Sequence, residues 1–227
     1  VAMKLIEVSP DQLNIHNNYG NKLLHLAIKK NQTDIAMKLI DRLQSSPDQF
    51  NVKDENGRTP LYYAIYLQHK DIAFALIKSL QSSPDQLNVA DQYGYTPLIL
   101  AISRENIQVA LKLISILPSD MLNTEDVWGS TPLHYAIEDK EGWTDDIALE
   151  LIERLQASPN QLNVKDKRGY TPLHLAINKK QTDIAMKLIE CLKASTNQLN
   201  IAGRYGYTPL HLAIDKGRTD IAMKLIE

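Results

Sequence analysis

The chain has 227 residues and a net charge of −2, from 25 basic and 27 acidic residues, and 44% of its residues are hydrophobic. This hydrophobic content excludes a disordered chain, and the balanced charge gives no electrostatic reason to expect nucleic acid or an anionic membrane as a partner. It has no run of about eighteen apolar residues and no signal peptide, so we expect an intracellular, cytoplasmic protein without a membrane span. The single cysteine, Cys191, cannot form an internal disulfide or a zinc site by itself, which favours a reducing compartment.

An asparagine followed six residues later by a glycine recurs along the chain at intervals of 35 to 40 residues. The prolines fall in the same register, either in a Thr-Pro pair or in a repeated phrase such as LQSSPDQLN. The sequence therefore predicts one domain of stacked repeats over 1–227. Its predicted parts are a partial repeat at 1–13 and repeats at 14–50, 51–87, 88–122, 123–162, 163–199 and 200–227, of which the last is incomplete.

The fifth repeat predicts a turn followed by two short helices. Its DKRG segment is typical of a turn with the glycine at positive φ. Thr171 and Pro172 then predict the N-cap and the first residue of a helix. After a polar break, Thr182 or Asp183 can cap a second helix with an apolar face. Two short helices cannot bury their apolar faces alone, so we expect the repeats to stack as an all-α solenoid.

The segments GYTPLHLAI (residues 169–177 and 206–214) and GSTPLHYAI (129–137) resemble the ankyrin-repeat signature, and the match covers nearly the whole chain. The resemblance implies hairpin-helix-loop-helix units and a concave face, built from hairpin tips and first helices, that binds another protein. The chain departs from the signature in several places. The first repeat lacks Thr-Pro, which predicts a poorer cap for its first helix, and other departures are Tyr62 and Ile99 in place of His, and Gly203 in place of the turn Asp.

The repeated phrase accounts for the repeat length, because ankyrin repeats have a period of about 33 residues. In SSPDQFN, Ser46 can cap a helical turn, Pro47 can begin it, and Gln49 can complete a capping box. The phrase therefore predicts an extra helical turn whose apolar residue lies beneath the stack. We interpret the phrase as a structural element of the stack rather than as a ligand site, because its sequence hardly varies between repeats. The apolar residues are Phe50, Leu87, Leu162 and Leu199.

The search for chemistry gives no catalytic, cofactor-binding or metal-binding residues, and we expect no enzyme activity. Four histidines share one repeat position, which favours a hydrogen-bond link between neighbouring repeats: His25, His134, His174 and His211. We expect His16, His69 and Cys191 to be exposed, and nothing in the sequence activates Cys191 as a nucleophile. The one carboxylate cluster, EDKEGWTDD at 138–146, matches no metal-binding loop.

We expect function where the repeats differ, at the hairpin tips and at the ends of the first helices. Tyr, Trp and Arg are the residues that dominate binding hot spots. The predicted partner-binding residues are Tyr66, Leu67, Tyr93, Tyr95, Arg104, Trp128, Glu138, Asp139, Trp143, Tyr170, Lys179, Tyr205 and Tyr207. Alternative interpretations are that the tip aromatics stack on the neighbouring hairpin, and that the loops have simply drifted.

The fourth repeat is the most divergent, with both tryptophans and a three-residue insertion around Glu141, Gly142 and Trp143. We expect that loop to protrude. We also expect Trp128, Trp143, Tyr66 and Asp139 to contribute to one binding face, and the acidic centre to favour a partner with a basic, apolar-anchored segment.

Three functions remain open at this point. The first is a non-catalytic protein–protein interaction module. The second is the targeting or substrate-recruitment region of a larger enzyme or of a secreted bacterial effector delivered into a host cell, and the third is a structural spacer. Both ends read as second helices, VAMKLIE and IAMKLIE, which predicts a fragment of a longer array whose uncapped ends stack end to end.

Overall fold

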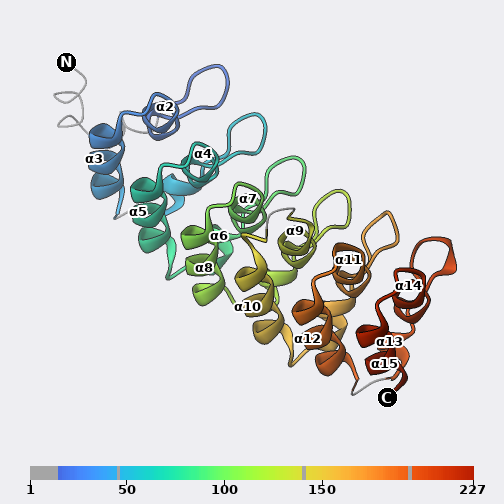
Figure 1. Cartoon of the computed structure of the whole chain (residues 1–227). Helices are drawn as coiled ribbons and strands as arrows, with labels where there is room; N and C mark the ends of the chain where they lie inside the picture. Colours follow the sequence, from blue (N-terminus) through green and yellow to red (C-terminus); the bar gives the residue numbers. More distant parts are fainter. Residues whose placement is uncertain (1–14, 45–46, 140–141, 194–195) are drawn as a thin grey trace. The chain divides into compact units, whose positions relative to one another are not determined.

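The computed structural model describes residues 15–44, 47–139, 142–193 and 196–227 (Figure 1). The chain divides into two compact units, Val1–Leu117 and Pro118–Glu227, called unit 1 and unit 2 below. The described residues contain helices and turns and no β-strand beyond an isolated antiparallel bridge between His16 and Lys22. The expected all-α class is therefore confirmed.

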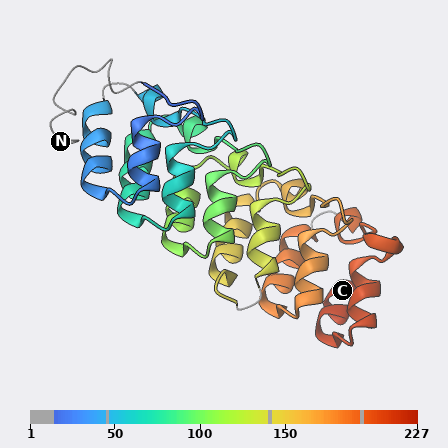
Figure 2. The ribbon, with the colours of Figure 1, turned by 90° about the horizontal axis from the view of Figure 1, so that it is seen from above.

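Unit 1 is built from pairs of helices joined by a short polar loop, with a further helical turn after the second helix of a pair. Its elements are α2 (Leu23–Lys29), α3 (Thr33–Leu43), the 3-10 turn η2 (Pro47–Asn51), α4 (Pro60–Tyr66), α5 (Lys70–Leu80), α6 (Pro84–Leu87), α7 (Pro97–Ser103) and α8 (Ile107–Ile116). The first helices α2, α4 and α7 contact one another in turn, and so do the second helices α3, α5 and α8. Figure 2 shows this stacking along the chain.

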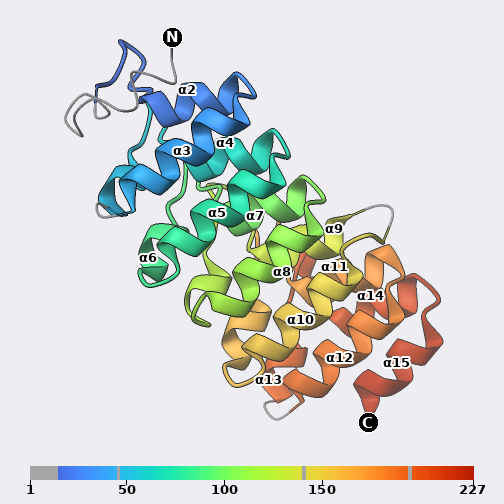
Figure 3. The same cartoon turned by 90° about the vertical axis from the view of Figure 1, so that its left-hand side faces the viewer.

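Unit 2 repeats the same plan. Its elements are η3 (Met121–Asn123), α9 (Pro132–Glu138), α10 (Asp145–Leu155), η4 (Pro159–Asn163), α11 (Pro172–Lys179), α12 (Thr182–Leu192), α13 (Thr196–Leu199), η5 (Arg204–Gly206), α14 (Pro209–Asp215) and α15 (Thr219–Ile226). The first helices α9, α11 and α14 are stacked, as are the second helices α10, α12 and α15 (Figure 3). The stacking expected for a repeat protein is thus present within each unit.

The caps of the first helices are confirmed where the sequence predicts them. Thr171 is the N-cap of α11, its hydroxyl accepts a bond from the His174 backbone N–H at 3.5 Å, and Pro172 is the first helical residue. The predicted cap of the second helix is wrong. Gln181, without a side-chain capping bond, precedes α12, and Thr182 is already helical. The side chain of Gln181 instead donates to Asp145, at 3.0 Å, in the neighbouring second helix.

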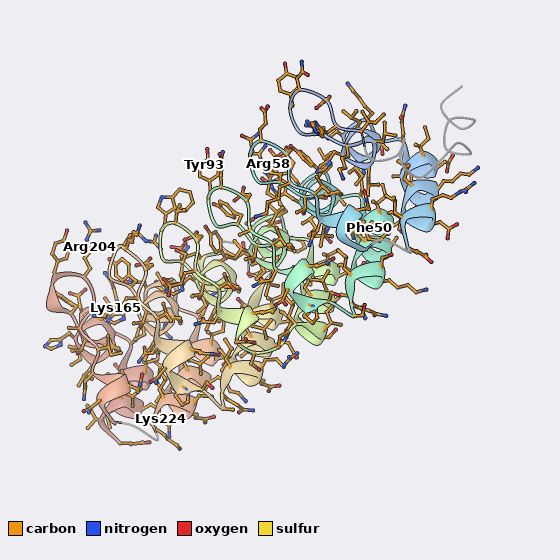
Figure 4. All side chains as sticks on the ribbon, turned by 180° about the vertical axis from the view of Figure 1, so that it is seen from behind. Phe50, Arg58, Tyr93, Lys165, Arg204 and Lys224 are labelled. Carbon is orange, nitrogen blue, oxygen red and sulfur yellow. The ribbon has the colours of Figure 1, made fainter. Side chains whose placement is uncertain are left out.

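The repeated phrase forms the expected extra turn, as α-helix in α6 and α13 and as 3-10 helix in η2 and η4. Phe50, Leu87 and Leu162 are fully buried, and Leu199 is half-buried. Because fully burying such a side chain contributes about 1.5–3 kcal/mol, the phrase stabilises the stack. In Figure 4, Phe50 lies away from the hairpins that carry Arg58 and Tyr93.

An asparagine of the phrase contacts the next phrase, whereas the serine makes no capping bond. The amide of Asn51 donates to the Gln86 carbonyl oxygen at 2.6 Å, so consecutive phrases are also joined by a hydrogen bond. Ser83 and Ser158, which hold the position of Ser46 in later phrases, are the N-cap residues of α6 and η4, but neither makes a side-chain capping bond. Ser46, for which the cap was proposed, lies outside the described residues.

Candidate protein-binding surface

A turn aspartate shapes the hairpins that precede the first helices α4, α7, α9 and α11. The Asp54 Oδ1 atom accepts bonds from the backbone N–H groups of Asn56 and Arg58, both at 2.9 Å, and the backbone of Asp54 donates to the Arg58 carbonyl at 3.0 Å. Gly57 then adopts a φ of 74°, as the sequence predicts for the turn glycines. The same arrangement recurs at Asp91 and, in unit 2, at the hairpins of the fourth and fifth repeats.

Neighbouring hairpins within a unit are joined by backbone hydrogen bonds. In unit 1, Gln92 N–H donates to the Asn56 carbonyl at 3.1 Å, and in unit 2, Lys167 N–H donates to the Trp128 carbonyl at 2.9 Å. These bonds fix the backbone of the tip residues, and the Trp128 side chain is 49% exposed. The hairpins therefore present side chains from a held backbone, which lowers the entropy lost on binding.

The predicted link between repeats is confirmed for His25, His134 and His174, whereas His211 in the last repeat is exposed and contacts Thr208 of its own helix cap. In α9, the His134 Nδ1 atom accepts from the Thr131 backbone N–H at 3.1 Å, and Nε2 lies 3.2 Å from the Tyr170 carbonyl of the next repeat. His25 and His174 make the corresponding contacts to the next hairpin at 3.2 and 3.0 Å. Burial lowers the pKa of His25, His134 and His174, which favours neutral rings with the proton on Nε2.

Exposed aromatic side chains gather on one part of each unit. Within the described residues they lie on hairpin tips, on the end of a first helix or in the loop after α9, and none lies on a second helix. They are Tyr19, Tyr66, Tyr93, Trp128, Trp143, Tyr205 and Tyr207. Exposed aromatics with a firmly held backbone are typical of protein-binding surfaces.

In unit 1, the structure brings together three of the five predicted partner-binding residues. Tyr66 and Leu67 end α4, are 40% and 38% exposed, and the Arg104 guanidinium carbon lies 3.8 Å from the centre of the Tyr66 ring. Tyr93 is exposed at its hairpin tip, and Tyr95 is half-buried beside it. The hydroxyl of Tyr63, which was not predicted, donates to Asp54 at 2.6 Å, and burial together with this bond raises the pKa of Tyr63 to about 12.

In unit 2, the predicted acidic residues are partly engaged within the chain. Arg168 Nη2 lies 2.5 Å from Glu138 and 2.6 Å from Asp166, and Lys179 Nζ donates to the Glu138 carbonyl at 3.0 Å. Glu138 is therefore less available to a basic partner than its position in the sequence suggested. The Thr144 hydroxyl donates to the Ala136 carbonyl at 2.6 Å and reaches Asp139 at 3.3 Å.

The inserted loop exposes its tryptophan. Trp143 is 61% exposed, and Gly142 adopts a φ of 74°. Glu141 lies outside the described residues. Burial and the nearby carboxylates of Asp139 and Asp146 raise the pKa of Asp145, the first residue of α10.

Three predicted tyrosines line one hollow between the last two repeats of unit 2. The hollow has a volume of about 160 Å³ and is lined by Tyr170, His174, Asn178, Arg204, Tyr205, Tyr207, Leu212 and Lys216. Tyr205 is the most exposed aromatic at 82%, whereas Tyr170 is half-buried. The last hairpin differs because Gly203 replaces the turn aspartate: Tyr205 there has a φ of 58°, and no aspartate fixes the turn.

Four cationic residues outside the predicted set of partner-binding residues also lie on these surfaces. Lys29 and Arg58 lie on aromatic rings of unit 1, and Arg168 and Arg204 lie near aromatic rings of unit 2. Arg168 and Arg204 could have been predicted from the sequence, because each is an arginine close to a tyrosine at a hairpin position that varies between repeats.

Cys191, His16 and His69 lie outside the shared histidine position and differ in exposure. Cys191 is half-buried rather than exposed, and burial raises its pKa, so nothing makes it a reactive thiolate. His16 is exposed as expected, and His69 is only half-exposed. No group of three His, Cys, Asp or Glu residues in the described parts of the chain is placed to hold a metal ion. No helix among the described residues is long and apolar enough to cross a membrane.

Comparison with known proteins agrees with this geometry. The sequence model of the family described as ankyrin repeats (3 copies) matches residues 1–86, 75–144 and 143–227. The chain belongs to the ankyrin repeat family. A search of curated proteins gave no match.

Two solved ankyrin structures share the fold. The ankyrin repeat domain of Bcl-3, described as a unique member of the IkappaB protein family, has a TM-score of 0.65 at 20% identity, over 91% of this chain and 86% of that one. The ankyrin repeat protein EF0377 has a TM-score of 0.66 at 22% identity, over 93% of this chain and 99% of that one. The resemblance drawn from the TPLH segments is thereby confirmed, and ankyrin repeats are in general protein–protein interaction modules.

Proposed function

We propose that this ankyrin chain is a non-catalytic module that binds a partner protein through its hairpin tips and the ends of its first helices. The observation that carries the proposal is the distribution of exposed aromatic residues. All seven of those in the described residues lie on hairpins, on the end of α4 or in the loop after α9. The second helices carry only aliphatic residues and methionine among their exposed large apolar side chains: Met37, Leu111, Met223 and Ile226.

A purely structural role for these aromatic residues is less well supported. A side chain that holds hairpins together is expected to be buried, as Tyr62 and Tyr63 are at 8% and 7% exposure. Trp143 and Tyr205 are instead 61% and 82% exposed. Their rings therefore contribute little to folding, and removing them is expected to change stability by less than about 0.5 kcal/mol each.

In unit 2 the binding surface combines Trp128, Trp143 and Asp139 with the hollow between Tyr170 and Tyr205. The hollow of about 160 Å³ is large enough for one side chain of a partner, and hot-spot residues commonly fill pockets of this kind. Because Arg168 pairs with Glu138, the surface is less acidic than the sequence suggests. A partner with a basic, apolar-anchored segment remains our proposal for the part around Asp139 and the two tryptophans.

The test compares capture of proteins from a lysate by the wild-type chain and by a Trp128→Ala, Trp143→Ala double variant, read by mass spectrometry. The matched control is Met223→Ala, because Met223 is 57% exposed on the second helix α15. We expect a protein that wild type and the control capture and the double variant loses, with equal helicity and melting for all three. Equal capture by all three would contradict the role of the two tryptophans.

A further inference from the structure

Cationic and aromatic side chains form a continuous series on the first helices of unit 1 and on the hairpin before α4. Lys29 Nζ lies 4.5 Å from the centre of the Tyr63 ring, and the Arg104 guanidinium lies 3.8 Å from that of Tyr66. Between these two ends, Arg58 lies 5.1 Å from the Tyr62 ring. The series therefore joins side chains of three successive repeats.

The tyrosine rings themselves are in contact. Tyr62 packs edge-on against Tyr63 with ring centres 5.6 Å apart, and it stacks on Tyr66 with centres 5.8 Å apart and an angle of 12° between the planes. We call this series, from Lys29 to Arg104, the cation–aromatic ladder. Its base, Tyr62 and Tyr63, is buried, whereas Tyr66 and both end cations are exposed.

The first helices α2 and α7 end in exposed cations. The last position of each first helix of unit 1 and the residue after it contain three cations and no carboxylate: Lys29, Lys30, Tyr66, Leu67, Ser103 and Arg104. In unit 2 the same positions contain both carboxylates and lysines: Glu138, Asp139, Lys179, Lys180, Asp215 and Lys216. No carboxylate within the described part of the chain forms an ion pair with Lys29, Lys30 or Arg104.

The turn aspartates of the two hairpins in this part of unit 1 are buried, whereas Glu55, at a hairpin tip, is exposed. Asp54 and Asp91 are 7% and 8% exposed. Asp54 accepts the Tyr63 hydroxyl and two backbone N–H groups, so its lone pairs are directed into the hairpin. The surface left to solvent has Lys29 and Lys30 on one side of Tyr66 and Leu67, and Arg104, beside the exposed Glu105, on the other.

We infer that the cation–aromatic ladder binds an acidic segment of a partner protein that crosses the first helices of unit 1. The inference rests on the proposed function and names the chemistry of one partner. Carboxylates of the segment pair with Lys29 or Lys30 at one end and with Arg104 at the other, and an apolar residue between them packs on Tyr66 and Leu67. Arginine held on a ring keeps its N–H groups free for a carboxylate in the plane of the guanidinium.

The repeat spacing predicts the pattern of the segment. Packed helices lie about 8–10 Å apart, so the first and third of three neighbouring helices are about 16–20 Å apart. An extended chain advances about 3.3 Å per residue, so the two acidic positions should be about five or six residues apart. The apolar residue lies midway between them.

The test is a selection of random displayed peptides of about twelve residues, which span the three helices at about 3.3 Å per residue. The full chain is the bait, and the selected peptides are then labelled for binding titrations by fluorescence anisotropy. The test variant is Lys30→Glu, Arg104→Glu. The matched control is Lys78→Glu, Lys112→Glu, which makes the same change of net charge at exposed residues of the second helices α5 and α8.

We expect selected peptides to be rich in Asp and Glu at the predicted spacing and to bind the test variant at least about tenfold more weakly than the control, with an affinity that falls as salt rises. Circular dichroism checks that both variants fold. Selected peptides without acidic enrichment, or equal binding to both variants, would overturn the acidic-segment inference and leave the proposed function standing. Tighter binding of polyuridylate, with displacement of the peptides, would overturn it in favour of nucleic acid. No selected peptide above an unrelated bait would overturn both.

Discussion

The hydroxyl group of Tyr63 donates a hydrogen bond of 2.6 Å to the carboxylate of Asp54, nine residues earlier. The same bond, also 2.6 Å long, joins Tyr135 to Asp126 in unit 2. In the third repeat the tyrosine position holds Leu100, and the Asp91 Oδ2 atom is buried without a hydrogen-bond partner. In these three repeats the residue at this position of the first helix decides whether the turn aspartate is satisfied. In the fifth repeat, where the position holds Leu175, Arg168 satisfies Asp166 instead, at 2.7 Å.

A Leu100→Tyr substitution should therefore stabilise unit 1 relative to Leu100→Phe, which adds the ring without the hydroxyl group. The difference in the free energy of unfolding should be about 1–3 kcal/mol, because a buried acceptor gains its donor. Chemical denaturation of the two variants measures it. If the phenylalanine variant is as stable as the tyrosine variant, Asp91 is satisfied in another way and the comparison between repeats fails.

The turn glycines offer a second matched pair. A Cβ atom at Gly57 would lie 3.1 Å from the backbone nitrogen of Gln92, and a Cβ at Gly206 would meet nothing within 4 Å. Both residues have positive φ, at 74° and 78°. We expect Gly206→Ala to cost only the backbone strain of about 1 kcal/mol, and Gly57→Ala to cost clearly more because the neighbouring hairpin must also move. Equal melting temperatures would show that the hairpins are not held against each other.

The repeated phrase is expected to act through its apolar residue and not through its serine. Phe50 is fully buried, so Phe50→Ala should destabilise the chain by about 3–5 kcal/mol. Ser83 makes no side-chain capping bond, so Ser83→Ala should cost less than about 0.5 kcal/mol, compared with about 1 kcal/mol for a real cap. Urea denaturation of both variants separates the two contributions, and a large loss for Ser83→Ala would restore the capping interpretation.

Stability should fall as the solution is acidified below neutral pH. Burial holds the pKa of His25, His134 and His174 below the ordinary value of 6.5, so the unfolded chain takes up these protons more readily than the folded one. The histidine contribution is therefore fully present above pH 6.5 and is lost as the pH falls through the lowered pKa values. Asp54, whose pKa lies below 3.8, does not titrate in this window: burial raises it, but bonds from Tyr63, Arg58 and Asn56 together outweigh burial.

The measurement is the urea midpoint between about pH 7.5 and pH 5 for the wild type and for His134→Ile, which copies Ile99 of the third repeat. The variant loses the link to Tyr170 and should be less stable at pH 7.5, but its midpoint should fall less on acidification. An equal fall for both chains would exclude His134 as a source of the pH dependence.

Much of the fold could be predicted because the same capping, turn and apolar positions recur in successive repeats of the sequence. Thr171 and Pro172 predicted a cap that the structure confirms, and the register of Phe50 and Leu87 predicted a buried turn. The prediction failed for Thr182, where several polar residues in a row can each cap a helix. The residue before this threonine position is the N-cap in other repeats too, at Gln32, His69 and Asn106, although none of them makes a side-chain capping bond. The Gln181 side chain bonds instead to Asp145, 36 residues away, a contact that the local sequence does not show.

The site was less predictable, because exposure and pairing depend on contacts between repeats. Nothing in the order of residues showed that Arg168 pairs with Glu138, or that Tyr170 is half-buried while Tyr205 is exposed. The departure of Tyr62 from the usual histidine was visible in the sequence. Its consequence, a ring that stacks on Tyr66 and carries Arg58, required the geometry of unit 1.

The most direct test of the proposed binding surface compares two equally exposed leucines of unit 1. Leu67 follows the first helix α4, Leu111 lies on the second helix α8, and both side chains are 38% exposed. A photo-crosslinking phenylalanine derivative at each position, irradiated in a cell lysate, reports which side of the unit contacts a partner. We predict a specific crosslinked protein from position 67 and none from position 111. Crosslinking from position 111 alone would contradict the assignment of the binding surface to the hairpins and first helices.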